Sequence, residues 1–421
     1  MQTLRQLLRA GLMSVLLLVA LASFASAAEE LMINSMHSDP VPKETFAAVV
    51  KEFQAQNPDI KVNLNTNAHE EFKKSVRVWL ASDNPPDVLT WFAGNRAMFF
   101  IEKGLILDIT DVWKDAGLFE KWPKAFQSIS FKDGKAYFMP DQYYWWAVYY
   151  RKSIFQKYNL AEPKTWEEFL KVCETLKANK VTPITIGTKA PWTAAAWFDY
   201  LNMRVNGPDF HMGLMLGSEK YTDPKLLETF KYWRQLIDKG YFLDNAASYA
   251  WQEAVQFMVK GEAAMYLMGQ FILDSVPAET KADMDFFQFP VINPAVKIGE
   301  DAPADGYMIP AKAKNPAAAK KFLKFLASKA SQEMFVKKTG RVSASSELPL
   351  EIYPAPTQKG IQMMQKVDAL AQFYDRDSKP EMADKGMNGF MEFWYKPDTI
   401  KQILERLEKE RDRIYKEAKD E

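Results

Sequence analysis

In the N-terminal part of the chain, segments with the apolar spacing of a helix alternate with short segments that have the pattern of a buried strand. Residues 46–53 are apolar at i, i+3, i+4 and i+7, which predicts a helix with one buried face. Residues 72–80 repeat that pattern, whereas 31–34, 60–64 and 87–92 are short apolar or alternating runs that predict strands. The order β-α-β-α-β predicts a parallel sheet with helices on both faces and a ligand crevice beyond the carboxyl ends of its strands.

The α/β pattern continues after a predicted hairpin. The Asp-Gly pair at 133–134 predicts a tight turn, and residues 145–150 predict the first strand of a second α/β unit. Thr165 and Glu168 have the spacing of a capping box, which predicts a helix with Cys173 on its inner face and therefore a core thiol. Further predicted elements are helices at 226–237, 251–260 and 400–414, strands at 263–268 and 305–310, and helical segments through 338.

The first 27 residues have the pattern of a secretory signal peptide. Arg5 and Arg9 precede an apolar run at 12–24, and small residues follow at 25–27. The run is shorter than the roughly 20 residues that a membrane-spanning helix needs. We therefore predict cleavage after this stretch and a mature protein in the periplasm of a Gram-negative cell. Cys173 lies far from the stretch, so no lipid anchor is predicted.

The size and composition of the chain indicate more than one folded unit. The chain has 421 residues, 48% of them apolar and a single one of them cysteine. A secreted chain with one cysteine forms no internal disulfide, so its stability must come from its own core. Chains longer than about 250 to 300 residues usually divide that core. We therefore expect two lobes.

Charge and motifs argue against several classes of function. The 54 Lys and Arg residues balance the 54 Asp and Glu residues, so no net charge attracts nucleic acid or an anionic membrane. The chain has no nucleophile elbow, P-loop or dinucleotide-binding fingerprint. Its three histidines, His37, His69 and His211, are too scattered for a local metal motif. We therefore expect no cofactor, no metal and no catalysis.

Six short motifs, in a fixed order along the chain, carry a resemblance to a known family. They are Phe-Gln-x-x-Asn-Pro-Asp-Ile-Lys-Val at 53–62, Pro-Pro-Asp-Val at 85–88, Gly-Lys-Ala-Tyr at 134–137 with Tyr-Tyr-Arg-Lys-Ser-Ile-Phe at 149–155, Pro-Lys-Thr-Trp-Glu-Glu-Phe at 163–169, Gly-Glu-Ala-Ala-Met at 261–265, and Asn-Pro-Ala-Ala-Ala at 315–319. With these motifs the chain resembles the extracellular solute-binding proteins of ATP-binding-cassette sugar importers, of the maltose-binding-protein type. The resemblance covers essentially the whole mature chain.

The resemblance implies an α/β, two-lobed periplasmic binding protein fold of type II, with a hinge between the lobes. The N-terminal lobe is expected to comprise residues 28–141 and 304–345, and the C-terminal lobe residues 142–303 and 346–421. The family binds a mono- or oligosaccharide between the lobes, closes on it and delivers it to permease subunits in the inner membrane. The chain is accordingly expected to act as a monomer.

The resemblance also implies site residues, one at a time. An uncharged sugar requires flat aromatic faces for the C–H side of its ring and fixed polar groups for its hydroxyls. In the N-terminal lobe we expect these contacts from His37, Trp91 and Asn95. At the first crossing between the lobes we expect them from Tyr144 and, as a further candidate, Trp145. His37 and Asn95 stand where the family carries charged residues, which favours an uncharged ligand.

The resemblance implies further stacking residues in the C-terminal lobe. Trp192, Phe271 and Trp394 stand where the family has stacking aromatic residues. The central hypothesis is that these rings and Trp91 enclose the sugar from opposite halves of the molecule. The remaining candidates are Trp251, Gly269, Gln270 and Asp305.

The sequence leaves three other functions open. One is a secreted carbohydrate-active enzyme, because the two carboxylates of glycoside hydrolysis need to meet only in space. Another is a binding protein for a polyamine, a phosphate ester or an iron chelate, which the uncharged residues at the charged positions of the family disfavour. The third is a sensor subunit that presents its closed form to a chemoreceptor, which the sequence does not distinguish from a transport receptor.

Overall fold

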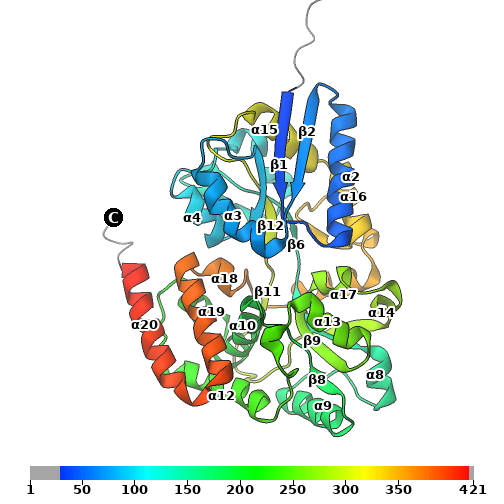
Figure 1. The fold of residues 1–421 in the computed structure, drawn as a ribbon, viewed down its shortest axis with the longest axis vertical. Helices are drawn as coiled ribbons and strands as arrows, with labels where there is room; N and C mark the ends of the chain where they lie inside the picture. The colour runs from blue at the N-terminus through cyan, green and yellow to red at the C-terminus, as the bar shows by residue number, and fades with distance from the viewer. Residues whose placement is uncertain (1–28, 417–421) are drawn as a thin grey trace, which may run out of the picture.

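The N-terminal lobe is built on a six-stranded sheet with the strand order β13-β6-β12-β3-β1-β2 (Figure 1). The computed structural model describes residues 29–416. Within them, β1 (Glu29–Ser35) pairs in parallel with β2 (Ile60–Thr66) and with β3 (Val88–Phe92), as the sequence predicts. The helices α2 (Pro40–Gln56) and α3 (His69–Ala81) connect these strands, also as predicted.

Three later segments complete this sheet. β12 (Ala304–Met308) runs antiparallel between β3 and β6 (Met139–Tyr143), and β13 (Val342–Ser343) pairs with the outer side of β6. The register of β12 against β6 shifts at Gly306. A Cβ atom there would lie 2.1 Å from the carbonyl oxygen of Met139, so only glycine lets the two backbones approach this closely.

The C-terminal lobe contains a four-stranded sheet with the order β10-β7-β9-β8. Its strands are β7 (Trp146–Arg151), β8 (Thr182–Ile184), β9 (Ala263–Gly269) and β10 (Met284–Phe287). A separate two-stranded sheet joins β11 (Gly299–Asp301) to β14 (Ala369–Ala371) near the hinge. This pair of strands could not be predicted from the sequence, because strands of three residues are too short to show an alternation of apolar and polar residues.

The remaining elements cover the two sheets. In the N-terminal lobe they are α4 (Asn95–Ile101), α5 (Thr110–Asp115), α6 (Leu118–Lys121), α7 (Ala125–Ser128), α15 (Pro316–Leu326), α16 (Lys329–Thr339) and the hairpin β4 (Phe131–Lys132) to β5 (Lys135–Ala136). In the C-terminal lobe they are α8 (Lys152–Lys157), α9 (Trp166–Ala178), α10 (Trp192–Asn206), α11 (Pro208–Met215), α12 (Pro224–Asp238), α13 (Trp251–Val259), α14 (Ala278–Asp283), α17 (Ala355–Met364), α18 (Tyr374–Asp377), α19 (Pro380–Tyr395), α20 (Ile400–Lys416) and the short 3-10 helices η1 (Ala246–Ser248), η2 (Gln270–Asp274), η3 (Leu350–Ile352) and η4 (Pro397–Thr399).

The chain passes between the two sheets three times. It leaves β6 after Tyr143 for β7, returns from β11 to β12 at residues 302–303, and leaves the first sheet again after β13. The predicted lobe boundary at 141/142 lies inside β6, and that at 303/304 lies at the start of β12. These crossings lie in the waist between the lobes (Figure 1).

Several local predictions are confirmed. The Thr165 side chain accepts a hydrogen bond from the Glu168 backbone N–H at 3.3 Å, and the Glu168 carboxylate accepts one from the Thr165 N–H at 3.2 Å. Cys173 is fully buried, and burial raises the pKa of its thiol. Two predicted strands are displaced at their ends, because the structure starts β7 at Trp146 and ends β12 at Met308.

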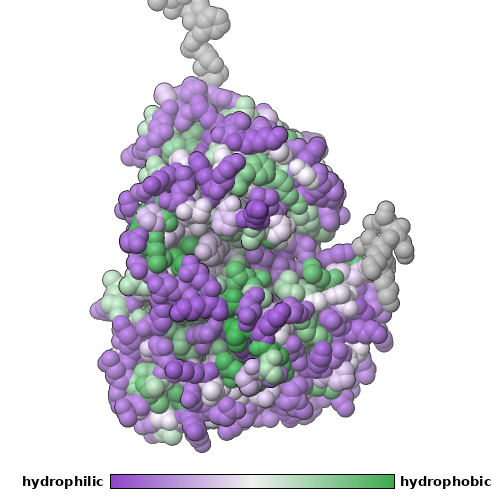
Figure 2. Space-filling model, turned by 180° about the vertical axis from the view of Figure 1, so that it is seen from behind, coloured by the Kyte–Doolittle hydropathy of each residue, from purple (hydrophilic) through white to green (hydrophobic). Residues whose placement is uncertain are grey.

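The predicted signal peptide lies outside the described residues, and no helix within 29–416 is long and apolar enough to cross a membrane. Seen from behind, the surface is mostly hydrophilic, and hydrophobic residues show mainly near and below the waist (Figure 2).

Candidate functional site

A cavity of about 90 Å³ lies between the lobes. The N-terminal lobe lines it with the ends of β1 and β3 and with the starts of α2, α3 and α4, which is the predicted edge of the parallel sheet. The C-terminal lobe lines it with the start of β7, the first residues of α10 and α13, and the segments that follow β9 and β14. The cavity therefore lies at the predicted crevice.

The wall on the C-terminal lobe is aromatic. The Phe271 ring lies at its centre, with ring centroids 5.2 Å from Trp251, 5.3 Å from Tyr144, 5.9 Å from Trp146 and 6.3 Å from Trp192. These neighbours meet it at steep angles, the geometry that aromatic quadrupoles favour. The result is a fixed apolar surface on one side of the cavity.

Phe373 extends this wall from an unusual backbone conformation. Its ring stacks on Trp146 at 4.7 Å with 22° between the planes. Its φ of +151° with ψ of 153° is a region that almost only glycine occupies, at a cost of about 1–3 kcal/mol elsewhere in proteins. The Asp377 carboxylate accepts a hydrogen bond from the Gln372 backbone N–H at 2.7 Å, which stabilises this turn. This backbone conformation brings the Phe373 ring, and the charged residues Asp375 and Arg376 that follow it, to the cavity.

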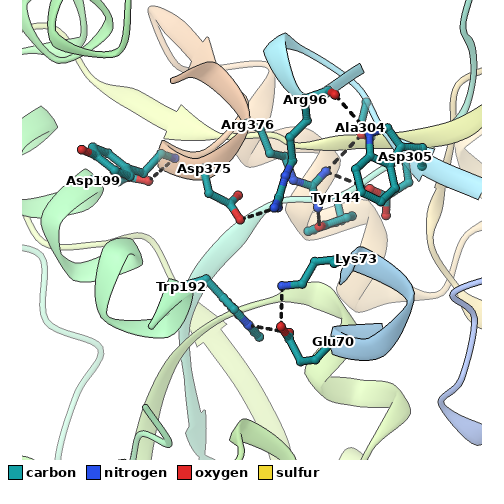
Figure 3. A network of polar contacts seen from close by, with 12 residues as sticks. Glu70, Lys73, Arg96, Tyr144, Trp192, Asp199, Ala304, Asp305, Asp375 and Arg376 are labelled. Atoms are coloured by element: carbon teal, nitrogen blue, oxygen red, sulfur yellow. Dashed lines mark hydrogen bonds and ion pairs between the residues drawn. The ribbon is translucent and has the colours of Figure 1, made fainter. Parts of the chain in front are cut away.

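Arg376 connects both lobes at the floor of the cavity (Figure 3). Its guanidinium donates to Asp305 Oδ1 at 2.8 Å, to the Ala304 carbonyl at 3.1 Å and to Tyr144 Oη at 2.6 Å. It also lies 4.4 Å from the centroid of the Phe92 ring. Since Arg376 and Asp305 are both buried, this pair is shielded from solvent.

The other two guanidinium groups of the cavity are paired as well. Arg96 contacts Asp375 at 2.6 Å, and Arg341 contacts Asp274 at 2.9 Å, in both cases between the lobes. Each guanidinium that lines the cavity thus has a carboxylate partner, so the lining presents hydrogen-bonding groups without a large uncompensated charge.

Two imidazoles and one carboxyl group complete the polar lining. Burial lowers the pKa of His37 to about 3 and that of His69 well below its usual value, and nearby cations such as Arg341 add to the effect. Both rings are therefore neutral near pH 7. The carboxyl group of Asp39 has a raised pKa because it is buried, and it accepts a hydrogen bond from Gln252 Nε2 of the other lobe at 3.4 Å. Groups of this kind match sugar hydroxyls as donors and acceptors.

The structure brings half of the predicted site residues to this cavity. They are His37, Tyr144, Trp192, Trp251, Phe271 and Asp305. Their contact with a ligand stays a prediction.

Three predicted residues of the first lobe and the first crossing lie elsewhere. Trp91 is buried among Phe72, Phe92 and Phe100. Asn95 donates from its side chain to the carbonyl of Asp377 in the other lobe. Trp145 is fully buried and packs on Phe286. Successive side chains of an extended segment point to opposite faces, so Phe92 and Trp146 reach the cavity in place of Trp91 and Trp145.

Three predicted residues of the C-terminal lobe also do not line the cavity. Gln270 is buried and donates to the Gly340 carbonyl at 2.7 Å. Gly269 acts indirectly, since a Cβ atom there would lie 2.4 Å from the Phe271 ring. Trp394 packs on Phe242 at 4.4 Å on the far side of its lobe. Of the four rings in the central hypothesis, Trp192 and Phe271 line the cavity and Trp91 and Trp394 do not. Most of the lining rings belong to the C-terminal lobe, and the enclosure of a sugar by rings from opposite halves stays a prediction.

Sequence reasoning missed the residues that supply the charge. They are Lys73, Arg96, Arg341, Asp375 and Arg376, and Phe373 of the aromatic wall was missed as well. Alternation from Tyr144 is the signal that could have identified Trp146 in place of Trp145, but no local pattern marks the others. They meet only because distant segments of the chain fold to the same cavity.

Beneath the cavity, the second crossing buries the carboxyl group of Asp301. Neither of its oxygens has a hydrogen-bond partner among the described residues. Burial, and then repulsion from Glu300 and Asp377, raise its pKa well above the usual range, against a smaller lowering by Arg204 and Arg376. In the folded state Asp301 therefore keeps its proton at a pH where the unfolded chain releases it.

Replacing Asp301 with Asn is expected to stabilise the protein increasingly as the pH rises above about 4. A raised folded-state pKa means that stability falls with increasing pH, by about 1.4 kcal/mol per pH unit until the folded-state pKa is reached, and an amide does not ionise. Thermal unfolding of both proteins at pH 4 and pH 7 measures this difference. An equal difference in Tm at both values would show that Asp301 is not a buried neutral acid.

No group of three or more His, Cys, Asp or Glu side chains within residues 29–416 is arranged to hold a metal ion. Of the acidic groups that line the cavity, Asp305 and Asp375 pair with guanidinium groups, and Asp39 accepts a hydrogen bond from Gln252.

Comparison with known proteins identifies a matching family model and related sequences. The family model for bacterial extracellular solute-binding proteins matches residues 38–333. An uncharacterized ABC transporter extracellular-binding protein of Pyrococcus horikoshii is 29% identical over 324 residues, which cover 75% of this chain and 72% of that protein. The multiple sugar-binding protein of Streptococcus mutans is 26% identical over 333 residues, which cover 75% and 76%.

Solved structures agree with this assignment. The bacterial solute receptor AcbH superimposes with a TM-score of 0.87 at 31% identity, over 92% of this chain and 100% of that one. A chitin oligosaccharide binding protein has a TM-score of 0.84 at 21% identity, over 92% and 100%. These neighbours confirm the predicted two-lobed α/β fold of type II. Since the family model covers well over half of the chain, the chain belongs to the family of bacterial extracellular solute-binding proteins.

Proposed function

We propose that this protein is the periplasmic receptor of an ATP-binding-cassette sugar importer and that it binds a single pyranose ring in the cavity between its lobes. The observation that carries the proposal is the cavity itself, which sets an aromatic wall opposite paired charges and neutral imidazoles. A sugar ring presents an apolar C–H face and a rim of hydroxyls, so it matches both surfaces.

The size of the cavity supports a monosaccharide. Its volume of about 90 Å³ corresponds to space for roughly six to nine water-sized bodies, at about 10–15 Å³ each. An oligosaccharide chain needs an open channel instead. AcbH, the 31% identical receptor, is described as having an exclusive preference for β-D-galactopyranose. We therefore propose D-galactose or a closely related monosaccharide as the ligand.

The charge arrangement argues against the ionic alternatives. A polyamine needs unpaired carboxylates, and a phosphate ester or an iron chelate needs unpaired cations. Of the carboxyl groups that line the cavity, Asp305 and Asp375 are each bound to a guanidinium group, and Asp39 has a raised pKa and accepts a hydrogen bond from Gln252. An ionic ligand would have to break one of these pairs, at a cost that an uncharged sugar avoids.

The same pairs suggest how binding is coupled to transport. Arg96 with Asp375 and Arg341 with Asp274 connect the two lobes across the cavity, so in the proposal these pairs form as the lobes close. A ligand that contacts both lobes shifts the population toward this form. In the proposal, the monomeric closed form then docks on the permease subunits, and no bond of the sugar is broken. The predicted signal peptide and the lobes at 28–141 with 304–345 and at 142–303 with 346–421 belong to the same proposal.

The test is a thermal-shift and calorimetric screen of the mature protein against monosaccharides and oligosaccharides. D-galactose or a close epimer is expected to raise Tm and to bind with a one-to-one stoichiometry, because a ligand of the folded state stabilises it by mass action. Small-angle scattering is expected to show a smaller radius of gyration with the same sugar. Stabilisation by a polyamine or phosphate ester but by no sugar, or turnover of an oligosaccharide, would contradict the proposal.

A further inference from the structure

The cavity ends at a wall that it shares with a second, outer groove. This groove has a volume of about 430 Å³ and lies between α3 and α4 of one lobe and the starts of α10 and α19 of the other. Lys73, Arg96, Trp192 and Asp375 line both the cavity and the groove. These four side chains therefore form the partition between them.

Two contacts between the lobes hold the partition together (Figure 3). The Trp192 indole N–H donates to Glu70 Oε1 at 3.2 Å, and Glu70 Oε2 lies 2.8 Å from the Lys73 ammonium group. Arg96 and Asp375 form the second contact at 2.6 Å. Glu70 itself lines the groove and not the cavity, so it fixes the indole from the outer side.

The groove has surfaces that suit a second sugar ring. Its lining includes the apolar side chains of Phe99, Pro191 and Met387 and the charged side chains of Arg77 and Asp384. Aromatic and apolar faces combined with charged hydrogen-bonding groups are the composition of a carbohydrate subsite. The partition alone separates this surface from the cavity.

We propose that the contact between Trp192 and Glu70 is the length selector of this receptor, which admits one sugar ring and excludes ligands that continue into the groove. The inference rests on the proposed function, because it assumes a sugar in the cavity. It assigns Trp192 a role beyond stacking, and it assigns Glu70 a positioning role that no sequence motif marks.

The contact can be broken without unfolding the protein. The Glu70 side chain is 46% exposed, and exposed ion pairs and hydrogen bonds of this kind contribute little to stability. Removing the Glu70 carboxylate frees the indole, and shortening Trp192 as well joins the groove to the cavity. Since the loss of stacking on Trp192 weakens every sugar alike, the informative quantity is the ratio of Kd for a disaccharide to Kd for its monosaccharide.

The experiment measures this ratio by calorimetry for the wild type, Glu70→Ala and the double variant Glu70→Ala/Trp192→Ala. The probes are D-galactose and galactosyl disaccharides joined through each hydroxyl in turn, or the monosaccharide that the screen identifies with its own disaccharides. In the wild type the ratio is expected to be large. For at least one linkage it is expected to fall by about tenfold in Glu70→Ala, and further in the double variant.

The matched controls are Glu71→Ala and Glu70→Gln. Glu71 is the next residue of the same helix and pairs with Lys74 rather than with the indole, so its loss is expected to leave the ratio unchanged. Glu70→Gln keeps an acceptor for the indole N–H and is expected to retain the selectivity. Tm without sugar shows that each variant is folded.

The outcomes separate the two proposals. A wild type that binds disaccharides as tightly as the monosaccharide, or a double variant with an unchanged ratio for every linkage, overturns the length selector and leaves the sugar receptor intact. A wild type that binds no sugar overturns the proposed function and this inference with it.

Discussion

Replacing Arg376 with Ala is expected to weaken sugar binding by roughly a hundredfold or more. The substitution removes the group that joins Asp305 and Ala304 of one lobe to Tyr144 and α18, and it leaves the Asp305 carboxylate without its partner in the closed cavity. Breaking a buried pair in this way costs about 3 kcal/mol or more, and each 1.4 kcal/mol corresponds to about tenfold in Kd. Titration calorimetry with the ligand found in the screen measures the loss.

Arg411→Ala is the control for this variant. Arg411 is also a buried arginine, and it donates to the Gly217 carbonyl at 2.9 Å in the C-terminal lobe, outside the cavity lining. Its loss is expected to lower Tm and to leave Kd unchanged. If Arg376→Ala lowers Tm as Arg411→Ala does but binds sugar as the wild type does, then Arg376 is a structural residue only.

Replacing Phe271 with Ala is expected to raise Kd by roughly tenfold to a hundredfold while the protein stays folded. The ring is the centre of the aromatic wall and is only partly buried. Burying a phenylalanine side chain against an apolar surface contributes about 1.5–3 kcal/mol, which the variant loses when the sugar binds. The loss is expected for every sugar that the protein binds, because stacking does not depend on hydroxyl configuration.

Trp394→Ala distinguishes the structure from the sequence-based hypothesis. The resemblance placed Trp394 on the sugar, whereas the structure packs it on Phe242 and Trp233 away from the cavity. We expect a lower Tm and an unchanged Kd. A large change in Kd for Trp394→Ala, together with a wild-type Kd for Phe271→Ala, would reverse the assignment of the aromatic wall.

Most of the fold could be predicted because its signals are local. The apolar spacing of α2 and α3, the capping box of α9 and the alternating runs of β1 to β3 each lie within a few residues of sequence. The short pair β11 and β14 could not be predicted, since a strand of three residues shows no period and its partner lies about 70 positions away.

The site could be predicted only in part, for two physical reasons. A shift of one residue in an extended segment moves a side chain to the other face, which exchanged Trp91 for Phe92 and Trp145 for Trp146. The charged groups are a different case. Arg376 lies in the four-residue helix α18, which follows the strained Phe373. Its partners come from three distant segments, at Phe92, Tyr144 and 304–305, so only the folded structure shows the pairing.

The position of the rings on one lobe has a consequence for the kinetics of the receptor. The aromatic wall, which we expect a sugar to contact first, is already formed before the lobes close, because nearly all of its rings belong to the C-terminal lobe. In the proposed function the encounter therefore depends on that lobe, while the N-terminal lobe, through Arg96 and Arg341, is expected to govern how long the complex persists. Changes in the two lobes are thus expected to act on different rate constants, the association rate in one case and the residence time in the other.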